Sequence, residues 1–199
     1  MKSKDRNFEG YKVTSKKLLR EYLTYEKHTY LDYMYPSKLH FLIGCLRSDW
    51  IIRIWRWQRV SRLCDFYNYS FHALGRWHHI LPYLYYQNRR NKLGVRIGME
   101  VNTCRIGKGL LIFHFNNVVN VNTVIGDNCH IHGQVVIGNG GGTNECPKIG
   151  DNVMIGAGAK IIGGVTIADR IKIGAGAVVA KSFFISGITI VGVPAKALK

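Results

Sequence analysis

One histidine in the C-terminal half of the chain has neighbours that suit it to acid-base chemistry. His114 lies between Phe113 and Phe115 in a stretch rich in strand-forming residues. Imidazole titrates near neutrality, so a positioned histidine can accept a proton from an alcohol as the alcohol oxygen attacks. We therefore predict that His114 is a general base, against the alternative that a single histidine beside aromatic rings only packs.

A second segment offers backbone chemistry. Residues 138–148 read GNGGGTNECPK, with consecutive glycines at 140–142. Such glycines expose backbone N–H groups that can bind a carbonyl or phosphate oxygen. We predict a ligand-binding loop here.

The elements that position these two segments follow from a repeat of six residues. Counted from Val119, 12 of 13 positions at this spacing are Val or Ile, and the exception is Thr143. In an α-helix a step of six residues rotates by about 240°, so the row would cover no single face. A chain that turns a corner every six residues buries the whole row, as in a parallel β-helix with three steps per coil.

The repeat predicts how the coils stack. Ile137, Ile155, Ile173 and Val191 are expected to share one interior edge, and the loop at 138–148 is expected to leave the register unchanged.

Upstream, the repeat is out of phase by one place. The aliphatic residues here also recur every six places, at Ile106, Ile112 and Val118, but this series runs one position ahead of the row that starts at Val119. The offset predicts an extra residue between Ile112 and Val119. Bulges of this kind often re-aim side chains at active sites.

The two halves of the chain differ in composition. Nineteen of the 23 aromatic residues precede Val95, whereas 18 of the 22 glycines follow Gly94. We predict a helical, basic and aromatic-rich domain at 1–94 and a β-helix at 95–199. Within the first, residues 50–63 predict an amphipathic helix with a basic stripe. Its arginines could be solvated on a packed helix or could contact a membrane surface through snorkelling side chains.

Charge and composition limit the function. A net charge of +16 suits a polyanion, an anionic membrane or a phosphate-rich small molecule. No nucleic-acid-binding motif is present, so nucleic acid is not expected. The five cysteines lack paired spacing, which favours reduced thiols. No apolar stretch approaches membrane-spanning length, and Met1–Lys12 lacks the apolar core of a signal peptide. We expect a cytoplasmic chain, with contact at the inner face of the membrane left open.

Four motifs in this order resemble the serine acetyltransferase branch of the hexapeptide-repeat acyltransferases. They are GKGLLIFH at 107–114, the Gly-Gly-Thr loop that ends in PKIG at 147–150, VMIGAGAKI at 153–161 and IVGVPAK at 190–196. The match covers about 100 residues, and the first half matches only as a helical domain of similar position.

The resemblance implies a mainly β fold, namely a left-handed parallel β-helix with an N-terminal α-helical domain. It implies an O-acetyltransferase that uses acetyl-coenzyme A, with His114 as the base and direct attack of the acceptor hydroxyl on the thioester. It also implies a homotrimer with active sites between subunits, and leaves open a hexamer formed through the N-terminal domains. No metal is expected. The implied cofactor contacts are backbone donors, small wall residues and groups near the nucleotide, namely Gly141, Gly142, Ala157, Lys160, Ala175, Lys181, Pro194 and Lys196.

Two positions depart from the pattern of serine-specific members, which carry Asp before the catalytic His and His before Pro-Lys-Ile. Here these positions are Phe113 and Cys146. Both changes remove polar partners for a free amino acid, whereas Phe113 and Phe115 resemble a platform for the apolar face of a sugar. We therefore expect acetyl transfer to a sugar hydroxyl in a capsule or lipopolysaccharide precursor, with serine O-acetylation in cysteine biosynthesis as the alternative. Cys146, Asn116 and Asn117 are predicted as further substrate contacts, because asparagine can bind a hydroxyl.

The family also supplies an acidic partner that orients the histidine. The aligned residue here is Met99, so the adjacent Glu100 is the predicted partner.

Three other functions stay open. A zinc site would use His114, His130 and His132, but the expected His-x-x-x-x-His spacing is absent. Covalent catalysis would need Cys104, Cys129 or Cys146, and Cys129 occupies an inward slot. A non-catalytic scaffold would leave His114 buried and idle.

Overall fold

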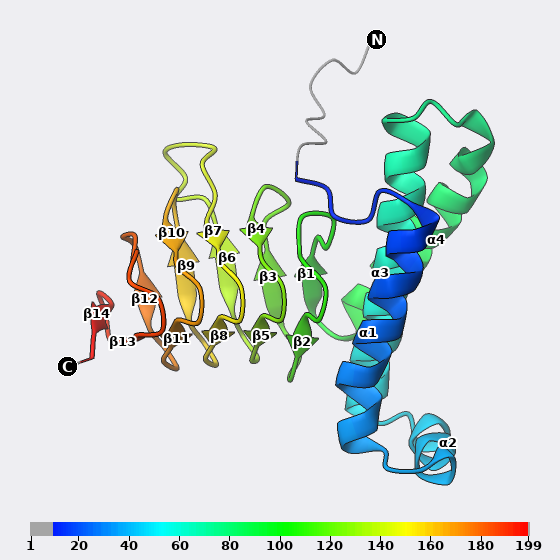
Figure 1. Cartoon of the computed structure of the whole chain (residues 1–199), viewed down its shortest axis with the longest axis horizontal. Helices are drawn as coiled ribbons and strands as arrows, with labels where there is room; N and C mark the ends of the chain where they lie inside the picture. Colours follow the sequence, from blue (N-terminus) through cyan, green and yellow to red (C-terminus); the bar gives the residue numbers. More distant parts are fainter. Residues whose placement is uncertain (1–9, 199) are drawn as a thin grey trace.

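A computed structural model describes residues 10–198 of the chain, so most of the segment Met1–Lys12, with its predicted lack of a signal peptide, lies outside the described residues. Helices gather at one end of an elongated stack of short strands, and the C-terminus lies at the other end (Figure 1).

The helices begin where the sequence provides caps. The side chain of Ser15 accepts a hydrogen bond from the Leu18 backbone N–H, and that of Ser37 accepts one from His40, so each hydroxyl satisfies an N–H that the helix leaves unpaired. The last helix continues two residues past the predicted boundary at 94. The helices are α1 (Lys16–Met34), α2 (Lys38–Arg47), α3 (Trp50–His72), a 3₁₀ turn (Trp77–His79) and α4 (Ile80–Arg96).

The exposed arginines of α3 match the predicted basic stripe, because Arg53, Arg56 and Arg59 are all exposed. Within the part of the chain that the structure describes, no helix is long and apolar enough to cross a membrane.

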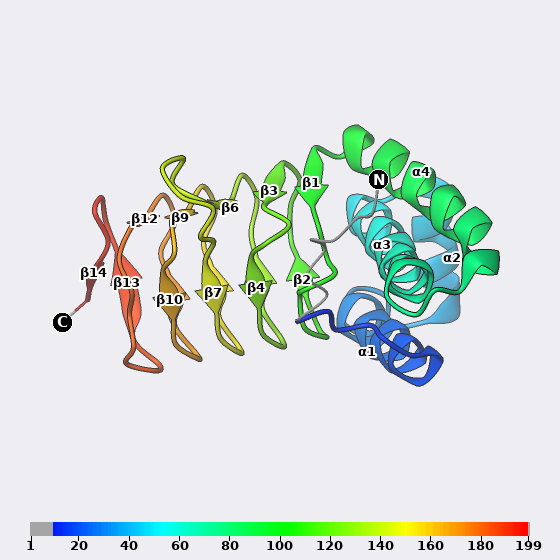
Figure 2. The same ribbon diagram turned by 90° about the horizontal axis from the view of Figure 1, so that it is seen from above.

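The strands are two or three residues long and form three sheets, which are the faces of a prism (Figure 2). All pairings except the last are parallel. The first sheet contains β1 (Met99–Val101), β3 (Asn117–Val119), β6 (Val136–Gly138), β9 (Lys160–Ile162) and β12 (Val178–Val179). The second contains β4 (Val124–Ile125), β7 (Lys148–Ile149) and β10 (Thr166–Ile167). The third contains β2 (Leu111–Ile112), β5 (His130–Ile131), β8 (Met154–Ile155), β11 (Lys172–Ile173), β13 (Thr189–Val191) and β14 (Lys196–Ala197).

The predicted interior edge is wrong in its register. Ile137 stacks on Ile161, whereas Ile155 and Ile173 continue to Ile190. The six-residue repeat does not show which residues stack on each other, because the loop at 138–148 adds six residues, which is one whole side of the prism. The loop therefore keeps the period of six but lengthens its coil, so the prediction that it leaves the register unchanged is also wrong. It projects from the stack between β6 and β7 (Figure 1).

The last coil departs from the repeat as well. Ile173 pairs with Ile190, one residue short of the predicted Val191. Ile185, which the repeat places inside, is 70% exposed, because Phe183 takes the place next to Ile167 and packs against the core.

The predicted extra residue is confirmed. Val101 pairs with Val119, while Ile112 pairs with Ile131, one residue further along. The surplus residue lies at the corner between β2 and β3, which is where His114 stands.

The helical domain covers the open end of the β-helix. An uncovered first coil would leave unpaired backbone groups at its edge. Three buried side chains bond these groups: the Tyr30 hydroxyl accepts from the Ile112 N–H at 2.8 Å, and the Gln58 amide donates to the Leu110 carbonyl at 2.9 Å.

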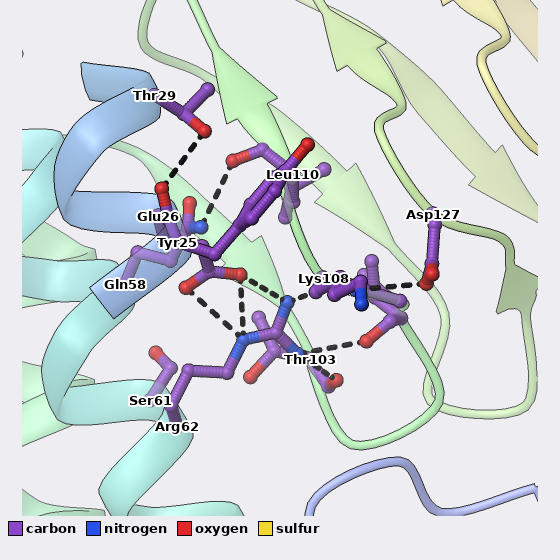
Figure 3. Close-up of polar contacts among 12 residues, drawn as sticks. Tyr25, Glu26, Thr29, Gln58, Ser61, Arg62, Thr103, Lys108, Leu110 and Asp127 are labelled. Carbon is purple, nitrogen blue, oxygen red and sulfur yellow. Dashed lines mark hydrogen bonds and ion pairs between the residues drawn. The ribbon is translucent and has the colours of Figure 1, made fainter. Parts of the chain in front are cut away.

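Arg62 is the third of these side chains and is completely buried. Its guanidinium donates to the carbonyls of Thr103, Ile106 and Gly107 at 2.7 to 2.9 Å and pairs with Glu26 at 2.6 Å. Figure 3 shows this guanidinium between α1 and the first coil. The helices therefore replace a preceding coil.

Candidate functional site

His114 occupies an exposed corner that differs from the corners stacked beyond it. The turn residue at this corner has a left-handed backbone in successive coils, with φ of 64° at Asn116, 61° at Gln134, 71° at Gly158 and 67° at Gly176. The first coil has one residue more than the others between its strand and this turn. The imidazole is thus carried on a bulge, which lifts it out of the regular wall.

Two neighbours hold the backbone of this corner. Asn117 is completely buried, and its amide donates to the His114 carbonyl at 2.9 Å and accepts from the Val135 N–H at 3.0 Å. On the next coil, a Cβ at Gly133 would come within 2.8 Å of the His114 Cβ. Since Asn117 has both amide ends committed to the fold, it shapes the corner, and the prediction that it contacts substrate is not supported by its burial.

The imidazole of His114 meets an aromatic ring from the helical domain. Trp50, the first residue of α3, stacks on it with 5.4 Å between ring centroids and 25° between planes. The contact with Trp50 could not be predicted from sequence, because 64 positions separate the two residues and only the docking of α3 brings them together.

The predicted pair of aromatic platforms does not form. Phe113 stacks on His132 with 4.7 Å between centroids, whereas Phe115 packs against the buried core. Residues two apart in a regular strand point to the same face. The two rings separate here because β2 ends at Ile112 and the bulge and the turn at Asn116 follow it. Asn116 is exposed at the turn beside His114.

His130 and His132 lie on the outer face of the third sheet, as predicted. Burial lowers the pKa of His132, and the positive charge of His114 lowers it further. Burial likewise lowers the pKa of His130, with a contribution from His132. Both imidazoles are therefore held toward the neutral form near neutrality.

A column of small residues runs along the same corner beyond His114. Gly158 donates its N–H to the Gly133 carbonyl at 2.9 Å, and Gly176 donates to Ala157 at 2.8 Å. Ala157 and Ala175 are exposed at matching places in this column. The wall is shallow here, which leaves room for an extended ligand.

Glu100 lies on a different surface from His114. It pairs with Val118 on the first sheet and lines a groove of about 960 Å³ whose lining does not include His114. Within residues 10–198, no hydrogen bond or ion pair reaches the imidazole of His114. The proposed partnership with Glu100 therefore stays a prediction, without a contact in the single chain.

The glycine-rich loop stands at another corner of the prism. Gly141 and Gly142 are exposed in it, and no atom lies within 4 Å of a Cβ built at either position. Cys146 is half-buried at the end of the loop. In one chain, these residues are therefore separated from the His114 corner.

The remaining predicted cofactor residues lie toward the C-terminal end of the β-helix. All four are exposed, and the three lysines carry the charge that suits contact with an anionic group. They are Lys160, Lys181, Pro194 and Lys196.

The thiols are poorly suited to covalent catalysis. Burial raises the pKa of Cys104 and of Cys129 to about 12, and it also raises the pKa of Cys146. A protonated thiol is a weak nucleophile. Among the described residues, all five cysteines are free, and no group of three His, Cys, Asp or Glu side chains could hold a metal ion.

Comparison with known proteins identifies the repeat. Residues 146–181 match the family model of the bacterial transferase hexapeptide (six repeats). The chain is 38% identical over 135 residues to a serine acetyltransferase of Staphylococcus epidermidis, covering 62% of this chain and 63% of the relative. It is 42% identical over 132 residues to the chloroplastic serine acetyltransferase 1 of Arabidopsis thaliana, covering 61% of this chain and 42% of the relative. The chain thus spans less than two thirds of the length of these curated relatives.

Solved structures extend the similarity to the helical half. Soybean serine acetyltransferase in complex with serine matches with a TM-score of 0.69 at 25% identity, covering 95% of this chain and 80% of that one. The Neisseria gonorrhoeae enzyme with serine gives 0.66 at 28% identity, covering 93% and 71%. The Brucella abortus enzyme with coenzyme A gives 0.69 at 25%, covering 92% and 68%. These are left-handed β-helix proteins, which confirms the predicted fold class.

The prediction of a sugar acceptor from surface polysaccharide biosynthesis is wrong. The relatives and the solved neighbours are serine acetyltransferases. The prediction treated Phe113 and Phe115 as one platform, but the fold places one ring on His132 and the other against the core. The C-terminal half is thus a hexapeptide-repeat β-helix of the bacterial transferase type, and the chain resembles the serine acetyltransferase branch of that superfamily.

Proposed function

We propose that this protein is a serine O-acetyltransferase that uses acetyl-coenzyme A as its acetyl donor, with His114 as the general base. The observation that carries the proposal is the corner itself, where an exposed imidazole on a bulge stands at the head of a column of small residues. Similarity to enzymes solved with serine and with coenzyme A supports the choice of both substrates.

The chain offers a surface that fits the donor. Ala157 and Ala175 present only methyl groups, so an extended pantetheine arm can lie against the corner. Lys160, Lys181 and Lys196 are exposed cations for the phosphates of the nucleotide. The donor supplies the acetyl group as a thioester.

His114 supplies the proton transfer. Its free imidazole nitrogen accepts the serine hydroxyl proton as that oxygen attacks the thioester carbonyl. The imidazolium then returns the proton to the departing coenzyme A sulfur. The O–H and C–S bonds break while the O–C and S–H bonds form, and the base is regenerated.

A direct assay tests the reaction. Purified protein with acetyl-coenzyme A and L-serine is expected to release free coenzyme A thiol and to form O-acetylserine, identified by mass spectrometry. Release without L-serine measures background hydrolysis, and D-serine is a matched control for acceptor recognition. Thiol release no faster with L-serine than without it would contradict the proposed acceptor. Transfer to a different hydroxyl compound would keep the chemistry but replace serine.

We also propose a homotrimer in which the glycine-rich loop of one subunit faces the His114 corner of the next. Support comes from the single chain, because Gly141, Gly142 and Cys146 stand at a different prism edge from His114. A closed ring of subunits can bring unlike edges together. A hexamer through the helical domains, a cytoplasmic location and contact of the α3 arginines with a membrane surface stay predictions.

Mixed oligomers test the shared site. His114→Ala and Gly142→Asp are each expected to be nearly inactive, and Gly142 has open space around it, so aspartate fits without a clash. Coexpressed in equal amounts, the two variants should recover activity at about one quarter of the sites, because one subunit of a pair then supplies both intact parts. Recovery no greater than the sum of the two variants alone, or a monomer by sedimentation, would contradict the proposal.

A further inference from the structure

The indole of Trp50 is placed by the helical domain against the candidate base. Its ring stacks on His114 with 5.4 Å between centroids and 25° between planes. Trp50 begins α3 and is itself 38% exposed, while the next two residues, Ile51 and Ile52, are buried in the core. A firmly anchored helix end thus holds a large aromatic ring over the imidazole.

Trp50 contacts the His114 imidazole, for which the family pattern predicts an orienting carboxylate. Met99 occupies the aligned position, and its buried sulfur lies 3.8 Å from the Asn117 amide that also holds the His114 carbonyl. Asn117 therefore fixes the backbone of the corner, and the contact with Trp50 is what restrains the imidazole plane. Gly133 on the next coil has no side chain, which leaves room for the Cβ of His114.

An aromatic face has two effects on a histidine base. Offset stacking restricts rotation of the imidazole, so the ring stays aligned with the acceptor oxygen. The electron-rich face of indole also attracts a cation, so it favours the imidazolium that forms during proton transfer. Both effects act in the transition state and leave the binding of either substrate largely unchanged.

We propose that Trp50 is the positioning residue for His114, taking the place of an acidic partner by stacking on the imidazole and stabilising its protonated form. The expected change in the rate of acetyl transfer rests on the proposed function. The expected change in the protonation of His114 rests only on the contact between the two rings.

The other ionisable groups around this contact have their own partners. Asp49 accepts from the Tyr35 hydroxyl at 3.1 Å and pairs with Arg47 at 3.8 Å, and Arg53 donates to the Ser48 carbonyl at 2.8 Å. On the coil side, His132 senses the charge of His114 and stacks on Phe113. A titration of His114 must therefore be compared at matched protonation of His132, which His132→Gln provides.

The first test is a titration that needs no turnover. The His114 imidazole is followed by NMR in the full-length protein, assigned by its loss in His114→Gln, with and without the His132→Gln change. Trp50→Leu is expected to lower the pKa of His114, and Trp50→Phe to lower it less. Trp77→Leu is the matched control, because Trp77 is 77% exposed and its ring contacts His78. An unchanged His114 titration in Trp50→Leu would overturn the proposal.

The second test is kinetic. Trp50→Leu is expected to lower kcat for acetyl transfer about two- to tenfold, with the KM for both substrates nearly unchanged and the limb of the pH profile that reports the base moved to lower pH. Trp50→Phe should retain most activity. A rise in KM alone would assign Trp50 to substrate binding, and an equal loss in Trp77→Leu would assign it to general stability; either overturns the proposal. If the wild type does not acetylate serine, the proposed function fails while the NMR titration still decides the role of Trp50.

Discussion

Replacement of His114 by alanine is expected to lower kcat/KM for acetyl transfer about 100- to 10,000-fold, which is the usual contribution of a positioned general base. Without the imidazole, the acceptor hydroxyl must lose its proton to water as it attacks. The melting temperature should change by no more than about 2 °C, because the side chain is exposed and only its contact with Trp50 is lost. Thiol release from acetyl-coenzyme A and a thermal scan measure the two effects.

His130→Gln is the matched control for this experiment. His130 is a histidine on the outer face of the same sheet, one coil further along, and it does not contact Trp50. It is expected to retain activity close to that of the wild type. Activity of His114→Ala within threefold of the wild type would contradict the role of His114 as the general base.

Replacement of Arg62 by leucine is expected to destabilise the fold by about 3–5 kcal/mol, the usual cost of removing one partner from a buried ion pair. The substitution leaves the Glu26 carboxylate buried without its cation and three first-coil carbonyls without their donor. Leucine fills part of the space but donates no hydrogen bond. For a chain of this size, that change lowers the melting temperature by roughly 6–20 °C.

Arg56→Leu is the matched control, because Arg56 is an exposed arginine in the same helix. It should change the free energy of unfolding by less than about 0.5 kcal/mol. Both variants are compared with the wild type at one protein concentration, since oligomer stability depends on concentration. A loss in Arg62→Leu no larger than that in Arg56→Leu would show that the helical domain does not close the end of the β-helix through this guanidinium.

The sequence by itself determined the β-helix and the location of the candidate base. Aliphatic residues at every sixth place have no buried arrangement in a helix, and a coil with three sides buries them all. The one-residue offset before Val119 then located the bulge, and with it His114, from local spacing alone. These features were predictable because each depends on neighbours along the chain.

The register of the coils was not predictable from the same pattern. A loop of six extra residues adds a whole side and leaves the period intact, so Ile137 pairs with Ile161 although the repeat suggests Ile155. Only hydrogen bonding between coils distinguishes the two.

The role of the helical half was decided by tertiary structure. Arginines at steps of three drift around a helix, so Arg62 lies about 180° from Arg53, and the row that begins in solvent ends buried against the first coil. Trp50 reaches His114 for a related reason. The open coil must cover its unpaired edge, and the docking of α3 that covers it also brings an indole onto the imidazole. No local pattern encodes that contact, because its two rings meet only after both halves have folded onto each other.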